Sequence, residues 1–217
     1  MMSNCEIKCE NLKHSFSGKT IFQGLSFQLS SGESLAVTGS NGSGKSTLLK
    51  VISNILSPHS GKISMFDGGE EIPRERFFTL LGMSAPYINL YDELTGYENM
   101  EFFLDLNNIS SPDRSRLNKE EEISKLLKQI GIYENRNKTV KNYSSGMKQR
   151  LRLAFSIIND PPVLLMDEPG TNLDSMGIEI VRRIAEKQKE KGILIIATND
   201  KEDLALCDRQ LNIEEYK

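Results

Sequence analysis

A glycine-rich segment in the first quarter of the chain has the residue types and the spacing of a phosphate-binding loop. It fits the pattern Gly-x-x-x-x-Gly-Lys-Ser/Thr. Glycines allow backbone N–H groups to point at phosphate oxygens, and a helix that starts at the lysine adds its positive end. We expect nine consecutive residues to bind a nucleoside triphosphate: Gly39, Ser40, Asn41, Gly42, Ser43, Gly44, Lys45, Ser46 and Thr47.

Two side chains of this segment have separate expected roles. Lys45 can reach the β- and γ-phosphates, and the Ser46 hydroxyl can ligate Mg²⁺. The alternative is a turn rich in Gly and Ser that matches the pattern by accident. An expected strand at 34–38 and the helix after the loop favour phosphate binding, because the motif works in that context.

Two adjacent carboxylates end an apolar run further along the chain, from Val163 to Glu168. An Asp that leaves a buried strand beside a phosphate loop can hold Mg²⁺, directly or through water. The adjacent Glu can polarise the attacking water as a general base. A strand that ends in Asp-Glu is common in itself, so the phosphate loop earlier in the chain favours the catalytic interpretation. We expect Asp167 to be a metal ligand and Glu168 the catalytic base.

Strands that alternate with helices must position these residues, and this order predicts an α/β fold. Short apolar runs predict buried strands of a parallel sheet at 80–81, 163–166 and 193–197. Alternating polarity and turn signals predict further strands near 5–12, 19–29, 34–38 and 61–66. Apolar residues at helical spacing predict helices at 45–56 and 178–191.

A polar stretch in the middle of the chain differs from the rest and is mostly helical. Its expected helices, 97–106 and 119–130, flank a break at Ser110-Ser111-Pro112. We interpret the stretch as a helical insert, so that the whole chain is one domain with three parts, namely core segments 1–85 and 150–217 and an insert at about 86–149.

The composition limits the class of protein. Of 217 residues, 38% are hydrophobic and 26% are charged, and the formal net charge is −3. Near-balanced charge argues against a nucleic-acid partner held by phosphate contacts. The longest apolar run, Ile193–Ala197, is far shorter than the ~20 residues of a membrane-spanning helix. The first residues lack the features of a signal peptide, so we expect a cytoplasmic protein that reaches a membrane through a partner.

Three cysteines are too few for a disulfide framework. Cys5 and Cys9 could form a metal or redox pair, although their spacing is not the two-residue kind. We favour reduced, half-buried thiols on or near the first strand, and we expect the same of Cys207.

Several motifs resemble those of ATP-binding cassette (ABC) ATPases, in that family's order. Tyr143–Arg150 is similar to the signature loop, normally close to Leu-Ser-Gly-Gly-Gln. Asp167–Asp174 resembles the Walker B motif running into the D-loop, and Leu90–Asn99 resembles the stretch after the Q-loop. The resemblance implies a P-loop NTPase (RecA-like) core with a small antiparallel β subdomain and an inserted α-helical subdomain.

The resemblance also implies a mechanism with ATP and Mg²⁺. Two subunits close head to tail on two ATP molecules, so that the signature loop of each contacts the γ-phosphate bound by the other. In this chain the implied signature residues are Ser144, Ser145, Gly146 and Met147. Asp174 would end the D-loop, and Phe16 would stack on adenine, although an ordinary core phenylalanine is the alternative for Phe16.

The chain departs from the family's pattern at two positions. Pro86 stands where the family has the Q-loop glutamine, which serves near Mg²⁺ and the attacking water; Ser84 or Tyr87 could substitute. Asn199 stands where the family has a switch histidine, and its amide can donate to a γ-phosphate oxygen without carrying the imidazolium charge. We therefore expect Lys45, Glu168 and Asn199 to support hydrolysis that is slow or depends on a partner.

These features indicate an ATP-hydrolysing subunit of a transporter, similar in size to heme-exporter-type and other single-cassette exporter subunits. Its expected partners are a second ABC ATPase subunit, identical or different, and separately encoded transmembrane permease subunits. Two alternatives stay open. One is a non-transport ABC ATPase of the iron–sulfur assembly type, and the other is a weakly hydrolysing subunit that senses nucleotide for a partner.

Overall fold

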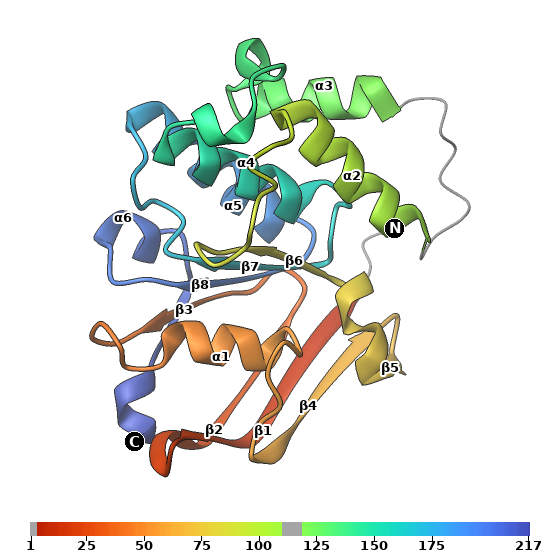
Figure 1. Cartoon of the computed structure of the whole chain (residues 1–217). Coiled ribbons are helices and arrows are strands. Elements are labelled where there is room, and N and C mark those ends of the chain that lie inside the picture. Colours follow the sequence, from red (N-terminus) through yellow and green to blue (C-terminus); the bar gives the residue numbers. More distant parts are fainter. Residues whose placement is uncertain (1–3, 110–118) are drawn as a thin grey trace.

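The structure is a computed structural model that describes residues 4–109 and 119–217. Two sheets and a layer of helices make up the fold (Figure 1). The expected break at Ser110-Ser111-Pro112 and the first three residues lie outside the described residues. The α/β class is confirmed, and so are the parallel core sheet and the smaller antiparallel sheet.

The antiparallel sheet comes mainly from the N-terminal part of the chain. Its strand order is β2-β1-β4-β5, with bounds β1 Cys5–Phe16, β2 Lys19–Ser30, β4 Ser60–Asp67 and β5 Glu70–Ile72. Apolar residues alternate along β1, so Cys5, Ile7 and Cys9 face the core. The sequence missed β5, because three residues of which two are glutamates carry no strand pattern.

The parallel sheet forms the centre of the molecule. Its order is β6-β7-β8-β3-β9, with bounds β6 Leu81–Ser84, β7 Val163–Asp167, β8 Ile193–Ala197, β3 Ser34–Thr38 and β9 Arg209–Asn212. Strands β7 and β8 are buried at every residue, as expected for a parallel sheet covered on both faces. The expected strand at 80–81 begins at Leu81 and runs further, and β9 was not expected.

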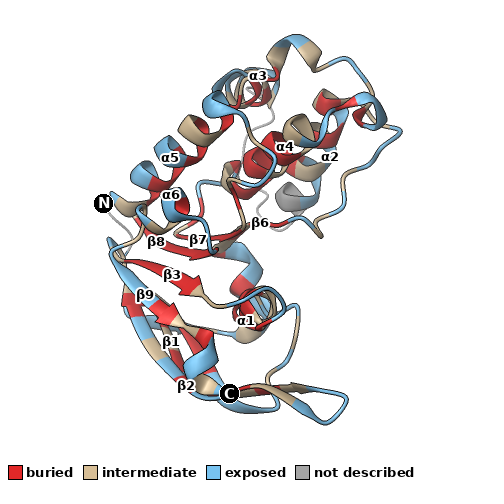
Figure 2. Ribbon diagram, turned by 90° about the vertical axis from the view of Figure 1, so that its left-hand side faces the viewer, coloured by how far each residue is buried: buried red, intermediate tan, exposed pale blue. Residues whose placement is uncertain are grey.

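Helices cover both faces of the parallel sheet. Helix α1 (Lys45–Ile52) lies between the two sheets, and the opposite face carries α4 (Ser145–Ile157) and α5 (Ser175–Lys189) (Figure 1). Helices α2 (Gly96–Ile109) and α3 (Lys119–Gln129) pack beyond α4. Figure 2 shows that buried residues concentrate where these layers meet.

Helix α1 is shorter than its apolar spacing predicts. The pattern continues to Leu56, yet the helix ends at Ile52, and Asn54 has a left-handed φ of 62° that turns the chain. Ile55 and Leu56 are the two candidates that the spacing offers for the last buried position, and of these Ile55 is exposed while Leu56 packs partly buried against the core.

The parallel register brings the carboxyl ends of three strands together. Val37 of β3 pairs with Ala197 of β8, and Ala197 pairs with Asp167 of β7. The loops that leave these strands must therefore meet at one edge of the sheet, where open α/β sheets bind ligands. Within the described ranges, no helix combines the length and the hydrophobicity needed to cross a bilayer.

Candidate nucleotide-binding site

The phosphate loop turns tightly between β3 and α1 because its three glycines all have positive φ angles, which other residues rarely adopt. Gly39 has φ 141° and Gly44 has φ 114°. A side chain at Gly39 would also place its Cβ 2.7 Å from Ser43 Oγ. These constraints leave the inner side of the loop to backbone groups, which is what a phosphate cradle requires.

Lys45 closes the loop from its helical end. Its side chain is 5% exposed, and Nζ donates to the carbonyl oxygens of Gly39 at 2.7 Å and Ser40 at 3.2 Å. Both acceptors are neutral, so the ammonium charge is not neutralised by these contacts. A phosphate oxygen would be a stronger acceptor for this charge.

An open cavity of about 220 Å³ lies against the loop. Its lining comes from the β2 residue Ile21, the phosphate loop and the start of α1, and the residue after β7: Ile21, Asn41, Gly42, Gly44, Lys45, Ser46, Thr47 and Glu168. The structure thus brings Glu168 to the same cavity as Lys45 and Ser46, although the sequence separates them widely.

Ser46 and Asp167 form a pair that fits Mg²⁺. The Ser46 hydroxyl bonds the Asp167 carboxylate, which is 2% exposed. The Asp167 Oδ1 atom is buried and has no hydrogen-bond partner among the described residues. A carboxylate oxygen and a hydroxyl are the hard ligands that Mg²⁺ takes, and an unpaired buried carboxylate oxygen is costly unless something binds it.

Burial also raises the pKa of Asp167, and the neighbouring Glu168 carboxylate adds to the effect. The hydroxyl of Ser46 and the charge of Lys45 oppose that rise. A bound divalent cation would favour the ionised carboxylate and offset the free-energy cost of burying its charge.

Glu168 adopts an unusual backbone conformation. Its φ is 48°, in the left-handed region that costs energy for a residue with a side chain. The Glu168 N–H donates to the Ala197 carbonyl at 2.8 Å, which fixes this turn to the end of β8. The turn redirects the chain directly after β7, so that Glu168 lines the cavity while Asp167 stays buried beside α1.

Asn199 reaches the phosphate loop from β8. Its Oδ1 accepts from the Gly39 N–H at 3.3 Å, and its Nδ2 lies 3.5 Å from Asn41 Oδ1. The amide therefore lies at the phosphate loop.

Asp203 is a residue that the sequence did not single out. It is 5% exposed, it accepts from the Thr198 hydroxyl at 2.9 Å, and it takes a second bond from the Gly170 N–H. Asp203 thereby joins the turn after Glu168 to the segment that carries Asn199. Asp203 belongs to the short helix α6 (Lys201–Leu204). No sequence motif could have revealed its role, because the role depends on a contact with Gly170, which is far away in the sequence.

The loop after β6 contains no glutamine, but it places a tyrosine beside α1. Pro86 is exposed, while the Tyr87 ring lies under Lys50, with Nζ 3.9 Å from the ring centroid. The Tyr87 hydroxyl is buried and lacks a hydrogen-bond partner among the described residues. Burial, and then the Asp167 charge, raise the pKa of Tyr87.

The signature segment lies on a different surface. Ser144 caps α4 by accepting from the Met147 N–H at 3.2 Å, and both Ser144 and Ser145 are exposed. Within the described part of the chain, the residues 144–147 contribute nothing to the lining of the phosphate-loop cavity. The start of α4 thus offers exposed N–H groups to something outside this chain.

Asp174 joins the D-loop to the signature helix. It caps α5 by accepting from the Gly177 N–H at 2.9 Å, and it forms an ion pair with Arg150 of α4. The Gly177 bond first and the Arg150 guanidinium second lower the pKa of Asp174.

Phe16 ends β1 and is 48% exposed, so the ordinary core interpretation is wrong. Its ring meets His14 edge-on, with 4.8 Å between ring centroids. An exposed aromatic ring offers a face for stacking, but Phe16 does not belong to the lining of the phosphate-loop cavity.

The three cysteines are free thiols. Cys5 and Cys9 are fully buried on β1, which is deeper than expected, and Cys207 is partly buried. Burial raises the pKa of Cys5 to about 11 and that of Cys207 to about 12, so both stay protonated and unreactive. Among the described residues, no group of three or more His, Cys, Asp or Glu could hold a metal ion.

Comparison with known proteins agrees with this geometry. The family described as ABC transporter matches residues 22–171. The lantibiotic transport ATP-binding protein SrtF of Streptococcus pyogenes is 34% identical over 193 residues, which are 89% of this chain and 79% of SrtF.

A second relative and a solved structure extend the similarity over nearly the whole chain. The cytochrome c biogenesis ATP-binding export protein CcmA of Mannheimia succiniciproducens is 29% identical over 219 residues, covering 100% of this chain and 98% of CcmA. A solved ATP-binding subunit of an ABC transporter superimposes with a TM-score of 0.80 at 25% identity, covering 95% of this chain and 85% of that one.

Proposed function

The chain belongs to the ABC transporter family, and we propose that it hydrolyses ATP slowly until partner subunits complete its site. It is an ATP-binding and ATP-hydrolysing subunit that couples this chemistry to substrate movement through separate transmembrane subunits. The observation that carries the proposal is the meeting of Lys45, Ser46 and Glu168 at one cavity.

Each residue of the proposed site has a task. Lys45 and the backbone of residues 39–47 bind the phosphates, and Phe16, exposed at the end of β1, stacks on the adenine ring. Glu168 orients the attacking water and accepts its proton, since it is the carboxylate that lines the cavity. Asn199 donates to the γ-phosphate, which it can reach from its place against Gly39.

Ser46 and Asp167 would hold the metal ion. Bound Mg²⁺ supplies positive charge that offsets the charge of the phosphate oxygens. The buried, unpaired Asp167 Oδ1 supports this assignment.

Slow turnover by the isolated subunit is proposed from Asn199. A neutral amide gives less stabilisation to a charged phosphate than an imidazolium, and one charge-stabilising contact in such a site is worth roughly 3 kcal/mol. A complete second cassette subunit in a heterodimer would provide one better-equipped site.

The proposed active form is a dimer in which each signature segment completes the other subunit's site. Its support is the position of Ser144 and Ser145, which are exposed and do not line the cavity of their own chain. We treat residues 1–217 as one domain, with residues 86–149 as the insert that carries the signature segment to the partner.

The permease is proposed to bind beside the loop that follows β6. An open groove of about 280 Å³ lies there, and its lining includes Ile88 of this loop together with Ile55 and Phe78, each 58% exposed. Apolar side chains around a groove suit an apolar or amphipathic partner segment. A permease segment in the groove would contact the loop that carries Tyr87 and would hold the subunit at the cytoplasmic face of the membrane.

The test is ATP turnover by the wild type and by Glu168→Gln. We expect the substitution to remove at least nine-tenths of the activity while ATP binding persists, because the amide cannot accept a proton. Glu190→Gln, an exposed glutamate at the end of α5, is the matched control and should match the wild type.

Equal turnover by Glu168→Gln and wild type would refute the role of Glu168. The sensing alternative predicts turnover at background in the wild type, with or without the permease. The relatives described above carry transport or export names, and they give no support to the iron–sulfur assembly alternative.

A further inference from the structure

Three buried polar atoms in or near the phosphate loop have no hydrogen-bond partner among the described residues. Ser43 Oγ belongs to the loop itself, and the other two are Asp167 Oδ1 and the Tyr87 hydroxyl oxygen. The latter two groups both lie beside α1, since Lys50 sits over the Tyr87 ring and Ser46 bonds Asp167, and the Asp167 charge acts on the Tyr87 hydroxyl. Leaving a buried hydroxyl unpaired is unfavourable, and its retention points to a partner that is present when the protein works.

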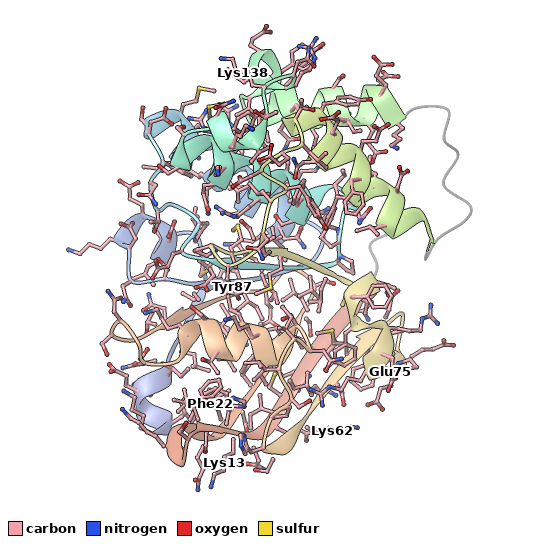
Figure 3. The ribbon with its side chains drawn as sticks, viewed as in Figure 1. Lys13, Phe22, Lys62, Glu75, Tyr87 and Lys138 are labelled. Carbon is pink, nitrogen blue, oxygen red and sulfur yellow. The ribbon has the colours of Figure 1, made fainter. Side chains whose placement is uncertain are left out.

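The Tyr87 ring is held in place by α1. Lys50 Nζ lies 3.9 Å from the ring centroid, and Lys50 follows Ser46 by one helical turn, so both lie on one face of α1. The charge of Lys50 also acts on Asp167. Figure 3 shows Tyr87 between α1 and the parallel sheet. The tyrosine therefore lies on the same side of the parallel sheet as the pair that fits Mg²⁺, one helical turn along α1.

Ser84, whose buried hydroxyl is also unpaired among the described residues, faces the other way. It pairs with Met166 in the register of β6 and β7, and paired residues point to the same side of a sheet. Met166 packs in the core on the α4 side, and the next residue, Asp167, points toward α1. The sheet thus separates Ser84 from the phosphate loop and leaves Tyr87 as the candidate.

We propose that Tyr87 is a positioning residue of the Mg²⁺ site, with its hydroxyl hydrogen-bonded to a water molecule on the ion that Ser46 and Asp167 hold. A phenol can donate to a carboxylate and accept from a water, so it suits a place between them. Such outer contacts orient metal ligands and are typically worth about tenfold in metal affinity or activity. This inference rests on the proposed function, because it requires bound ATP and a metal ion.

The test compares Tyr87→Phe with its parent in a Glu168→Gln background, where ATP stays intact. Mn²⁺ replaces Mg²⁺ as the probe, and electron paramagnetic resonance measures its affinity in the presence of saturating ATP. We expect Tyr87→Phe to weaken Mn²⁺ binding about tenfold. Binding of ATP in excess EDTA should not change, and the melting temperature should stay equal or rise, because the lost hydroxyl was unpaired.

Tyr133→Phe is the matched control, since Tyr133 also lies under a cation, with Arg136 4.0 Å from the ring centroid, but belongs to the helical layer. It should bind Mn²⁺ like the parent. Equal Mn²⁺ affinities for Tyr87→Phe and the parent would overturn the inference alone, and so would a loss of metal-free ATP binding or a lower melting temperature. A parent protein that binds neither ATP nor Mn²⁺ would instead overturn the proposed function.

Discussion

At the scale of single residues, the site depends on side chains that hold loops as well as on those that meet the nucleotide. Glu168 and Asn199 leave neighbouring strands, and Asp203 joins their loops through Gly170 and Thr198. Glu168 is held in a strained conformation, which requires surrounding contacts to persist. Asp203 supplies such a contact without facing the cavity.

Asp203 should make stability depend on pH in a predictable direction. Burial raises the pKa of Asp203 above its value in the unfolded chain. Its contribution to stability is therefore fully present below the unfolded pKa of about 3.9 and is lost as pH rises through the folded pKa. Urea unfolding at several pH values should show the stability of the wild type falling relative to Asp203→Asn as pH rises from 4 to 7.

The Asn variant does not titrate at this position, so other groups cancel in the comparison. A difference between the two proteins that stayed constant across this pH range would contradict the prediction. Turnover of Asp203→Asn, measured alongside, should fall if the loops of Glu168 and Asn199 lose their common anchor.

At the scale of elements, α4 is the part that connects the site to its surroundings. Arg152 Nε donates to the Ile88 carbonyl at 3.0 Å, and Lys148 pairs with Asp92 at 2.7 Å, so the helix holds the loop after β6 at two points. At its first turn the same helix carries the signature segment, and Arg150 ties it to the D-loop residue Asp174.

Arg152→Gln should therefore weaken the link between permease and ATPase. The shorter side chain cannot hold the Ile88 carbonyl in the same way, so we expect permease-stimulated turnover to drop several-fold while unstimulated turnover stays near that of the wild type. Reconstituted complexes with and without permease would measure both. Arg183→Gln, on the exposed face of α5, is the control. Equal losses of stimulated and unstimulated turnover would count against a coupling role.

The sequence predicts the strands and helices best where burial imposes a strict pattern. Strands β7 and β8 are buried at every residue, and their apolar runs could be placed to within one residue. Strand β9 escaped prediction because an edge strand that begins with Arg209 and Gln210 leaves both exposed and lacks the usual pattern. Helix α1 ended early because a left-handed residue, Asn54, overrode continuing apolar spacing.

The residues of the candidate site likewise fall into those that the sequence could predict and those that only the fold reveals. Residues fixed by spacing along the chain, such as Lys45 and Ser46, are placed by the motif itself. Asp203 and Tyr87 act through contacts between segments far apart in the sequence, and only the fold brings these segments together. The register of β6 likewise shows that Ser84 faces the side of the sheet away from the phosphate loop, which leaves Tyr87 as the candidate. The sequence alone could not make this choice.

At the scale of the whole molecule, the chain presents a nucleotide cavity and a signature segment on separate surfaces. Ser145→Glu should prevent dimer closure without harming the fold, because an acidic residue suits the first turn of a helix but repels a partner's γ-phosphate. Sedimentation in the Glu168→Gln background with ATP should give a dimer, and addition of Ser145→Glu should give monomers. Dimers of unchanged strength would contradict the proposed role of the signature segment.

The separation of Ser144 and Ser145 from their own chain's cavity also has a genetic meaning in the proposed dimer. A subunit with a damaged signature segment still has an intact phosphate loop, so it can form a dimer with a normal subunit. In that dimer it cannot contact the γ-phosphate of the ATP that the normal subunit binds. In a cell that carries one normal and one damaged allele, transport activity would therefore not be proportional to the number of normal gene copies. The damaged allele would be partly dominant, and the share of impaired transporters would exceed the share of damaged gene copies.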